Sequence, residues 1–547
     1  MTFHRISTVC AAIGLAAALA TLPLRAADEP IDYASIARIK AQGLNEANSQ
    51  VMEIASWLTD VHGPRLSGSP NIQKAGEWAV AKMQEWGLVN VALEPWTNPL
   101  GFTRGWSNDK FYLAAVSPQA FPIPGTPSAW TPGTNGLVRG EVLLVTGTTE
   151  EDLREYSGKL KGKFVLPSEP PDVAAWWTAP AQRLTREDLD RRETPVPPEF
   201  GVTPPGGRGG GRGAAAAGRG GRGGRGAAAA GGPPPAPPFS RNAFFLKEGV
   251  VAIFATSGRG HGIYTIGGNR NADPAATLPS ITIPAEHYGR MARMIQKGIP
   301  VTIEADITNT FHPNPTMFNV VGEIPGTDKA DELVMLGAHF DSWHASTGAT
   351  DNAAGSAAMM EAMRILKQSG VPLRRTVRIA LWNGEEQGLN GSRDYVAKHF
   401  ATRGPAPGGG GGRGRGNAGP LQPKPAHGKF SAYFNIDNGT GASRGVYLQG
   451  NDAVAPIFRA WIEPFRSIGI THLTINNTGG TDHQSFDAVG LPGFQFIQDS
   501  VEYGSLTHHY NLDSWERLQP TDMRRNATIA AAFAFLAANR EELLPRK

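Results

Sequence analysis

The sequence contains one cysteine, Cys10, and it lies in an apolar segment at the N-terminus. This segment joins basic residues, a short apolar run and small residues before Asp28, a pattern typical of a secretory signal peptide cleaved near Ala26. We therefore assign residues 1–26 to a signal and expect an exported protein, periplasmic or secreted. The mature chain would have no disulfide, no thiol nucleophile and no cysteine zinc ligand.

Long apolar runs are also absent. After residue 26 no stretch approaches the roughly 18 uninterrupted apolar residues of a membrane helix, so we expect no membrane span in the mature chain. The formal net charge is only +3, and many arginines lie in two glycine-rich tracts, 204–238 and 403–425, which leaves the remainder net acidic. A nucleic-acid partner is therefore not indicated. The two tracts have too few apolar residues to offset the entropy of ordering them, and we predict disordered insertions.

The rest of the chain shows two different sequence patterns. Helical periodicity and apolar strands in 27–125 and 308–547 predict one discontinuous α/β domain, with a mostly parallel central sheet flanked by helices. Short strands between glycine and proline turns in 126–307 predict an inserted, mostly β domain. A chain of 547 residues is long enough for both.

Three predicted strands of the second half, at 333–338, 377–382 and 430–436, each run directly into polar residues. In open α/β sheets the ligand crevice lies at the carboxyl ends of the strands, so we expect these side chains to share one rim. Two loops add more residues of the same kind. In chain order the set is His339, Asp341, Asp351, Glu385, Glu386, Asp437, His508 and His509.

Imidazoles and carboxylates without thiolates are typical ligands of Zn²⁺ or a similar divalent ion, with Mn²⁺ and Co²⁺ as substitutes. One bridging aspartate would suit two ions roughly 3.5–4 Å apart. A pair of ions acidifies a bound water, and a nearby glutamate can take its proton and pass it to a leaving amine. The residues alone leave open which of Glu385 and Glu386 is the base.

Six strings occur in order along the chain: GAHFDSW, ATDNAAG, WNGEEQGLNGS, NIDNGTG, GGTDHQSF and THHYNLD. Together they resemble the M28 family of zinc exopeptidases, and within it the carboxypeptidase Q-like dipeptidases. The inserted β domain is similar to the protease-associated (PA) domain of many members. The resemblance therefore covers nearly the whole mature chain and implies hydrolysis of dipeptides or short peptides at a chain terminus.

The resemblance also implies a role for each residue. His339 and Asp437 would bind one zinc ion, Glu386 and His509 the other, and Asp351 would bridge the two. Glu385 would be the general base, and the Asp341 carboxylate would orient His339. His509 is preferred to His508 because it stands four residues before Asp513. We further expect His483 to face the substrate and to hold an oxyanion or a terminal group.

Several alternatives remain open. The nearest is an M28 aminopeptidase, because the sequence does not show which terminus is anchored; more distant are a one-zinc glutaminyl cyclase-like enzyme and a non-catalytic binding protein. The string 441–445 fits the Gly-x-Ser-x-Gly pattern of serine hydrolases, but a strand follows where that motif needs a helix. No histidine is followed by glutamate, which excludes the zincin motif. The side-chain preference and the oligomeric state, including the homodimer that the resemblance suggests, are not readable.

Overall fold

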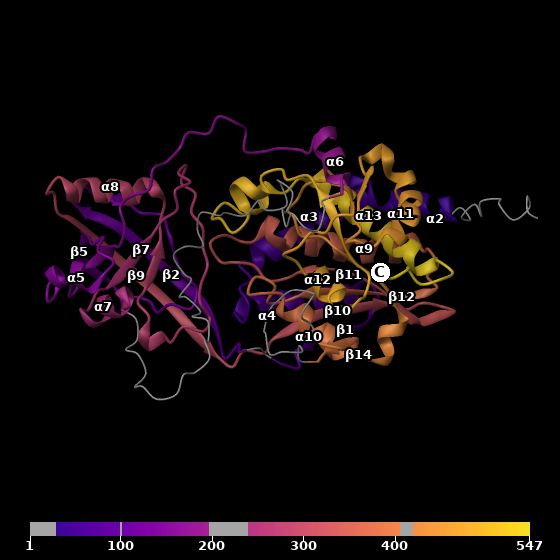
Figure 1. Cartoon of the computed structure of the whole chain (residues 1–547), viewed down its shortest axis with the longest axis horizontal. Helices are drawn as coiled ribbons and strands as arrows, with labels where there is room; N and C mark the ends of the chain where they lie inside the picture. The colour runs from indigo at the N-terminus through magenta and orange to yellow at the C-terminus, as the bar shows by residue number, and fades with distance from the viewer. Residues whose placement is uncertain (1–28, 99–100, 196–238, 405–418) are drawn as a thin grey trace, which may run out of the picture.

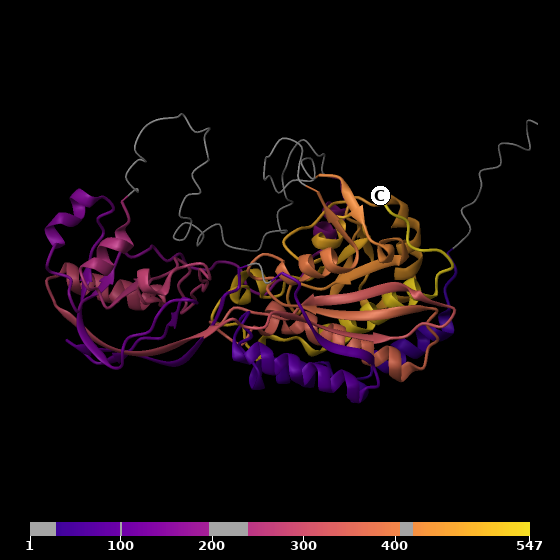
Figure 2. The ribbon, with the colours of Figure 1, turned by 90° about the horizontal axis from the view of Figure 1, so that it is seen from below.

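A computed structural model of the chain has two lobes that lie side by side (Figure 1; Figure 2). It describes residues 29–98, 101–195, 239–404 and 419–547. The predicted signal peptide and the tract at 204–238 lie outside the described residues, as does most of the tract at 403–425. The described ends of the second tract pair as two short strands, β13 (Ala401–Arg403) and β14 (Leu421–Pro423).

The larger lobe is built on an eight-stranded sheet. Its order is β1 (Val89–Pro95), β10 (Phe318–Ile324), β12 (Arg375–Trp382), β11 (Lys329–His339), β15 (Phe430–Asn435), β18 (Gly493–Gln498), β16 (Ser443–Tyr447) and β17 (His472–Thr474). The four central strands β12, β11, β15 and β18 are parallel, whereas β1 pairs antiparallel with β10, β10 with β12, and β16 with β18. The predicted α/β class is confirmed; the sheet is mixed, with parallel pairing at its centre and again between β16 and β17 at one edge.

Helices cover both faces of this sheet. One face packs against α2 (Tyr33–Gly43), α3 (Val51–Ser56), α4 (Pro70–Glu85), α9 (Ala354–Ser369), α11 (Ala455–Ile462) and α13 (Pro520–Asn539). The other face packs against α10 (Asn390–His399) and α12 (His483–Asp487). Along β11, Val334 and Leu336 join the first core and Met335 joins the second, so that the apolar run is buried on both sides.

Two helix ends follow directly from local sequence. Ser69 precedes the first-turn proline of α4, and its side chain accepts a hydrogen bond from the main-chain N–H of Ile72. Gly370 ends α9 in the left-handed conformation, with φ 59°, which costs a residue without a Cβ little. At its other end, α9 begins directly after the turn that carries Asp351.

The smaller lobe has its own eight-stranded sheet. Its order is β3 (Phe121–Pro122), β2 (Arg104–Ser117), β9 (Val301–Pro313), β5 (Val138–Leu144), β6 (Phe164–Leu166), β7 (Ala252–Ala255), β8 (Ser280–Thr282) and β4 (Thr126–Pro127), with helices α5 (Glu150–Leu153), α7 (Arg241–Lys247) and α8 (Ala285–Gln296). The sheet begins before residue 126 and ends after residue 307, because β2 and β9 form a long antiparallel ribbon. That ribbon leads from one lobe to the other (Figure 1).

One segment of the smaller lobe crosses to the larger one. We call residues 171–195 the crossing segment; it ends in α6 (Arg186–Glu193), which Figure 1 shows lying over the larger lobe. Leu189 of α6 is buried against Tyr447 and Ile497. Upstream, the main-chain N–H of Gln182 donates to the carbonyl of Val501 at 2.9 Å. The smaller lobe is thus attached to the larger one at points distant from the β2–β9 ribbon.

Candidate metal centre

The rim formed by three adjacent strands carries the candidate metal ligands. β11 lies between β12 and β15 and is parallel to both, so their carboxyl ends meet at one edge of the sheet. His339 is the last residue of β11, Asp437 follows β15, and the loop after β12 carries Glu385 and Glu386. Asp351 reaches the same edge from the turn that precedes α9. The spatial convergence expected from the strand ends is therefore present.

His339 is held in one orientation by its neighbours. Its Nδ1–H donates to the main-chain carbonyl of Asp341 at 2.9 Å, which directs Nε2 toward the carboxylates. Nε2 lies 3.1 Å from Oδ1 of Asp351 and 3.2 Å from Oδ1 of Asp437. Burial lowers the pKa of His339, but Asp437 and Asp351 raise it well above its ordinary value. This trio therefore attracts positive charge at Nε2, either a proton or a metal ion.

A second trio forms around the other oxygen of Asp351. Nε2 of His509 lies 2.9 Å from Oε2 of Glu386 and 3.4 Å from Oδ2 of Asp351. Nε2 of His508 is farther from this oxygen, at 3.9 Å, and its ring is tilted at 41° to that of Tyr503. The distances therefore favour His509 over His508 as the partner of Glu386. Asp351 presents one oxygen to each histidine.

The donor atoms fit a bound cation. Oδ2 of Asp351 and Oε1 of Glu386 are buried and have no hydrogen-bond partner. Burial and the neighbouring Asp351 raise the pKa of Glu386 well above its ordinary value, as expected for crowded carboxylates without a counter-ion. Buried carboxylates are normally paired or bind metals, so these two oxygens and the histidines form a site suited to divalent ions.

Asp341 lies behind this site, and its contacts differ from the expectation. Only its main-chain carbonyl hydrogen-bonds His339; the carboxylate Oδ1 is 3.8 Å from Nδ1 of that histidine. The carboxylate instead accepts hydrogen bonds from the main-chain N–H groups of Glu385 and Glu386, at 3.1 and 3.3 Å, and from the hydroxyl of Ser67 at 2.9 Å. Asp341 thus fixes the loop that carries both glutamates.

Glu385 is placed to act as a base. Burial raises the pKa of its carboxyl well above the ordinary value, and the nearby Asp437 and Asp482 add to the increase. A carboxylate with a raised pKa accepts a proton from water more readily. Its neighbour Glu386 points to His509, so the two adjacent residues occupy different positions in the site.

His483, which we expect to face the substrate, lies buried at the start of α12. Its side chain is 0% exposed, and its Nε2 hydrogen-bonds the carbonyl of Thr478. Burial lowers its pKa to about 4, so the ring is neutral. Ser443 of the serine-hydrolase pattern is likewise buried, lies in β16 and donates to Asn526, which agrees with the rejection of that motif.

The sequence did not reveal two residues that support the site from behind. Asp513 accepts hydrogen bonds from the main-chain N–H groups of Thr350 and Asp351, at 2.6 and 3.1 Å. Arg65, far upstream, is fully buried next to the same loop. In the sequence, Asp513 was used only to choose between His508 and His509. Arg65 follows a turn, and no motif around it indicates a role in the site.

The smaller lobe contacts the metal-ligand loops directly. The main-chain N–H of Ile266 donates to the carbonyl of His509 at 3.2 Å, and Thr265 forms an antiparallel bridge with Tyr510. His509 has a φ of 61°, an uncommon value for a residue with a side chain. Arg270 donates to the carbonyl of Gln387, immediately after Glu386, at 3.2 Å. The conformation of both loops therefore depends on contacts from the other lobe.

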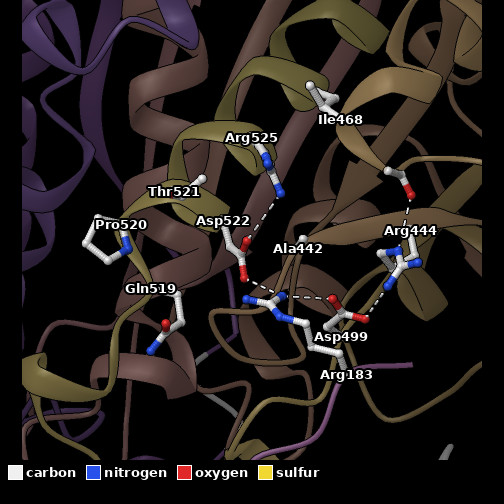
Figure 3. A pocket seen from close by; sticks show the side chains of 11 residues that line it. Arg183, Ala442, Arg444, Ile468, Asp499, Gln519, Pro520, Thr521, Asp522 and Arg525 are labelled. Atoms are coloured by element: carbon white, nitrogen blue, oxygen red, sulfur yellow. Dashed lines mark hydrogen bonds and ion pairs between the residues drawn. The ribbon is translucent and has the colours of Figure 1, made fainter. Parts of the chain in front are cut away.

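A separate cavity of about 390 Å³ lies between the crossing segment and α13 (Figure 3). Arg183 of the crossing segment pairs there with the buried carboxylates of Asp499 and Asp522, at 2.9 and 2.7 Å, and Arg444 pairs with the other oxygen of Asp499. Figure 3 shows these guanidinium groups directed at the carboxylates. Arg525 adds a third guanidinium, 3.8 Å from Asp522, so both carboxylates are paired with arginines of this chain, and the cavity lies at an attachment point of the smaller lobe.

Comparison with known proteins agrees with this arrangement. A model described as "Peptidase family M28" matches residues 319–534, which include every candidate metal ligand. These residues form a peptidase family M28 domain. Carboxypeptidase Q of Mus musculus is 24% identical over 523 residues, covering 95% of this chain and 92% of its own. Leupeptin-inactivating enzyme 1 of Streptomyces exfoliatus is 24% identical over 40% of this chain and 47% of its own.

Solved structures share the fold. The crystal structure of a peptidase M28 precursor from Shewanella amazonensis SB2B has a TM-score of 0.61 at 22% identity and covers 94% of this chain and 100% of its own. BSAP, a zinc aminopeptidase from Bacillus subtilis, has a TM-score of 0.50 at 17% identity, covering 90% and 96%. With its M28 domain, the protein is a metallopeptidase, a hydrolase of peptides, and its donor set indicates zinc.

Proposed function

We propose that this M28 metallopeptidase is a two-zinc exopeptidase that hydrolyses dipeptides or short peptides. His339 and Asp437 would hold one ion, Glu386 and His509 the other, and Asp351 would bridge them. The proposal rests on one observation: the two oxygens of the Asp351 carboxylate face different histidines. Oδ1 lies 3.1 Å from Nε2 of His339, and Oδ2 lies 3.4 Å from Nε2 of His509. A carboxylate that faces two separate imidazoles is suited to bridge two ions.

The remaining chemistry follows from the protein side chains. When bound, the ions supply Lewis acidity, which polarises the scissile carbonyl and acidifies water. Glu385, held through its main-chain N–H by Asp341, takes the proton from water and delivers it to the leaving amine. Asp513 keeps the Asp351 turn in place through two main-chain hydrogen bonds, so the bridging carboxylate needs little reorganisation.

The walls of the site bear on which terminus is bound. The space beside His509 is lined by Ile266, Trp343 and Tyr510 together with the carboxylates of Asp351, Glu386 and Asp513. The described residues of this lining include no lysine or arginine that could bind a C-terminal carboxylate. A lining without a cation favours a free N-terminus over a C-terminal carboxylate, and both a dipeptidase and an aminopeptidase would recognise that terminus. We propose a dipeptidase as the first candidate, because the relatives that match most of the chain are carboxypeptidase Q proteins. An aminopeptidase is the second candidate.

A panel of blocked peptides distinguishes the candidates. Hydrolysis of one dipeptide should be measured in its free, N-acetylated and C-amidated forms with the mature protein. We expect N-acetylation to abolish cleavage, because both candidate activities recognise a free N-terminal ammonium group. Loss of cleavage on C-amidation as well indicates a dipeptidase, and its retention an aminopeptidase. Cleavage of the N-acetylated form alone would contradict the proposed orientation, and release of cyclised N-terminal glutamine would support a one-zinc cyclase.

We also propose that the smaller lobe, which the sequence likens to a PA domain, shapes the site. Two of its segments enclose the loop that carries His509: Pro180 and Gln182 contact Ser505 and Val501 on one side, and residues 262–266 contact 509–511 on the other. Arg259 adds hydrogen bonds to the carbonyls of Ser505 and Gly504, at 2.9 and 3.2 Å, and covers the ring of Tyr510 at 4.4 Å.

Replacement of Arg259 should therefore impair catalysis without removing any ligand. We expect Arg259→Ala to lower kcat/KM by about tenfold, because a small displacement of a positioned group has effects of this order or larger. The measurement is steady-state hydrolysis of the best dipeptide. Arg290→Ala is the matched control, since Arg290 covers the ring of Phe121 at 3.8 Å in the smaller lobe. Equal kcat/KM values for the two variants would argue against a shaping role.

Export is also a proposal. Its only support is the sequence pattern at residues 1–26, which lies outside the described residues. Within the described ranges, no helix is long and apolar enough to cross a membrane. N-terminal sequencing of the protein recovered from a secreting host would test it, with cleavage near Ala26 as the expected result.

A further inference from the structure

Arg65 has an unusual environment for a charged residue. Its side chain is 0% exposed, and it lies in the loop between α3 and α4. All four acceptors of its guanidinium among the described residues are main-chain carbonyls. Buried arginines are normally paired with a carboxylate, so a fully buried one bonded only to carbonyls calls for a specific reason.

The four carbonyls belong to the elements that carry the metal ligands. Nε donates to Phe340, between His339 and Asp341, at 2.8 Å. Nη1 and Nη2 donate to Thr347 and Gly348, in the turn that leads to Asp351, both at 2.9 Å. The fourth acceptor, Leu58 at 2.8 Å, anchors the guanidinium to the N-terminal helices. One planar group therefore ties the end of β11 to the Asp351 turn.

The main chain of Arg65 extends this attachment. Its N–H donates to the hydroxyl of Ser342 at 3.1 Å, and its carbonyl accepts from the N–H of Ser342 at 3.1 Å. Two residues on, Ser67 donates to the carboxylate of Asp341. The segment 65–67 thus runs along the far side of the ligand-bearing strand end and contacts it at several successive points.

The charge of Arg65 also acts on the site. Burial lowers its pKa to about 10, which leaves the guanidinium protonated at neutral pH. The carboxylates that act on it most strongly are those of Asp513, Asp341, Asp351 and Glu386. A fixed cation behind crowded carboxylates lowers their mutual repulsion before any metal is present.

We propose that Arg65 is a positioning residue for the metal centre, whose guanidinium holds the His339 strand end and the Asp351 turn in register so that the ligands stand ready to bind metal. It touches neither substrate nor metal. The inference rests on the proposed metal site, but it concerns a residue that no candidate motif contains.

The test is zinc binding by the metal-free protein, followed by competition with a chromophoric chelator. Arg65→Lys keeps the charge but loses the planar fork, so the two elements are no longer held together. We expect its affinity for zinc to fall by roughly 10–100-fold, the range seen when groups that orient metal ligands are removed. Ser342→Ala, a milder change that removes one contact of the same attachment, should lower the affinity less.

Arg375→Lys is the matched control. Arg375 is also 0% exposed and donates to the carbonyls of Ala537, Arg540 and Glu541, and its Nε pairs with the carboxylate of Glu332 at 2.6 Å. It lies at the first residue of β12, the end opposite Glu385. Both lysine variants should unfold at a lower temperature, and only Arg65→Lys should bind zinc more weakly.

The outcomes separate the two hypotheses. If the wild-type protein takes up no zinc, the proposed metallopeptidase site is wrong. If the wild type binds zinc and Arg65→Lys matches it within about twofold, a purely structural role explains Arg65 and our inference fails. Should Arg65→Lys not fold, the affinity of Ser342→Ala decides, and an unchanged value overturns the proposal.

Discussion

Glu385→Gln should lower the rate of dipeptide hydrolysis by about 10³-fold or more, near the upper part of the range for general acid–base catalysis. The amide is isosteric with the carboxyl but cannot accept the proton of water or return it to the leaving amine. Because the loop is fixed through main-chain N–H groups bonded to Asp341, the substitution should leave the fold and the ligands in place. The measurement is kcat at saturating substrate, with metal content determined on the same sample.

The neighbouring residue provides the control. Glu386→Gln replaces the partner of His509, whose Nε2 lies 2.9 Å from the glutamate, so it should lower the bound zinc per chain as well as activity. Glu385→Gln should keep the wild-type zinc content. If both variants lose zinc equally, the division of roles between the two glutamates is wrong; if Glu385→Gln stays active, Glu385 is not the base.

Removal of metal should have the second large effect. Chelation should abolish hydrolysis and lower the midpoint of thermal unfolding by about 5–10 °C, because ligands that bind only the folded state stabilise it by roughly 2.7 kcal/mol each at a hundred times their Kd. The loss of stability has a local cause. Without cations, the carboxylates of Asp351 and Glu386 remain close together with one unpaired oxygen on each. Differential scanning calorimetry before and after chelation, and after return of zinc, measures the change.

A variant of the bridging residue tests the cause of this shift. In Asp351→Ala both proposed sites lose a ligand, so chelation should no longer move the unfolding midpoint. A shift of unchanged size in Asp351→Ala would place the stabilising metal elsewhere. A shift reduced by about half would indicate that one ion still binds without Asp351, so that Asp351 serves one of two ions and does not bridge them.

The part of the site predictable from sequence is the part set by strand ends. His339, Glu385 and Asp437 each follow an apolar strand, and parallel strands bring their carboxyl ends to one edge whatever their separation along the chain. The capped ends of α4 and α9 were similarly predictable, because serine and glycine act on the few residues around them.

The remaining features depend on contacts between distant segments. Arg65 and Ser342 are 277 positions apart, and no periodicity relates them. Among the antiparallel strand pairs of this sheet, β1 with β10 joins segments more than 200 residues apart, and apolar runs do not encode that pairing. His483 is buried and hydrogen-bonded to the carbonyl of Thr478, a placement that its polar motif does not encode.

The enclosure of the His509 loop by two segments of the smaller lobe has a consequence for protein engineering. The lobe cannot be treated as an exchangeable module joined only at its two chain crossings, because residues 180–182 and 262–266 also form part of the scaffold of the loop at 501–511. In a chimaera that takes the smaller lobe of a relative, joined at β2 and β9, the contacts between that lobe and the loop at 501–511 would not match. Transferring the 501–511 loop together with the donor lobe would preserve these contacts.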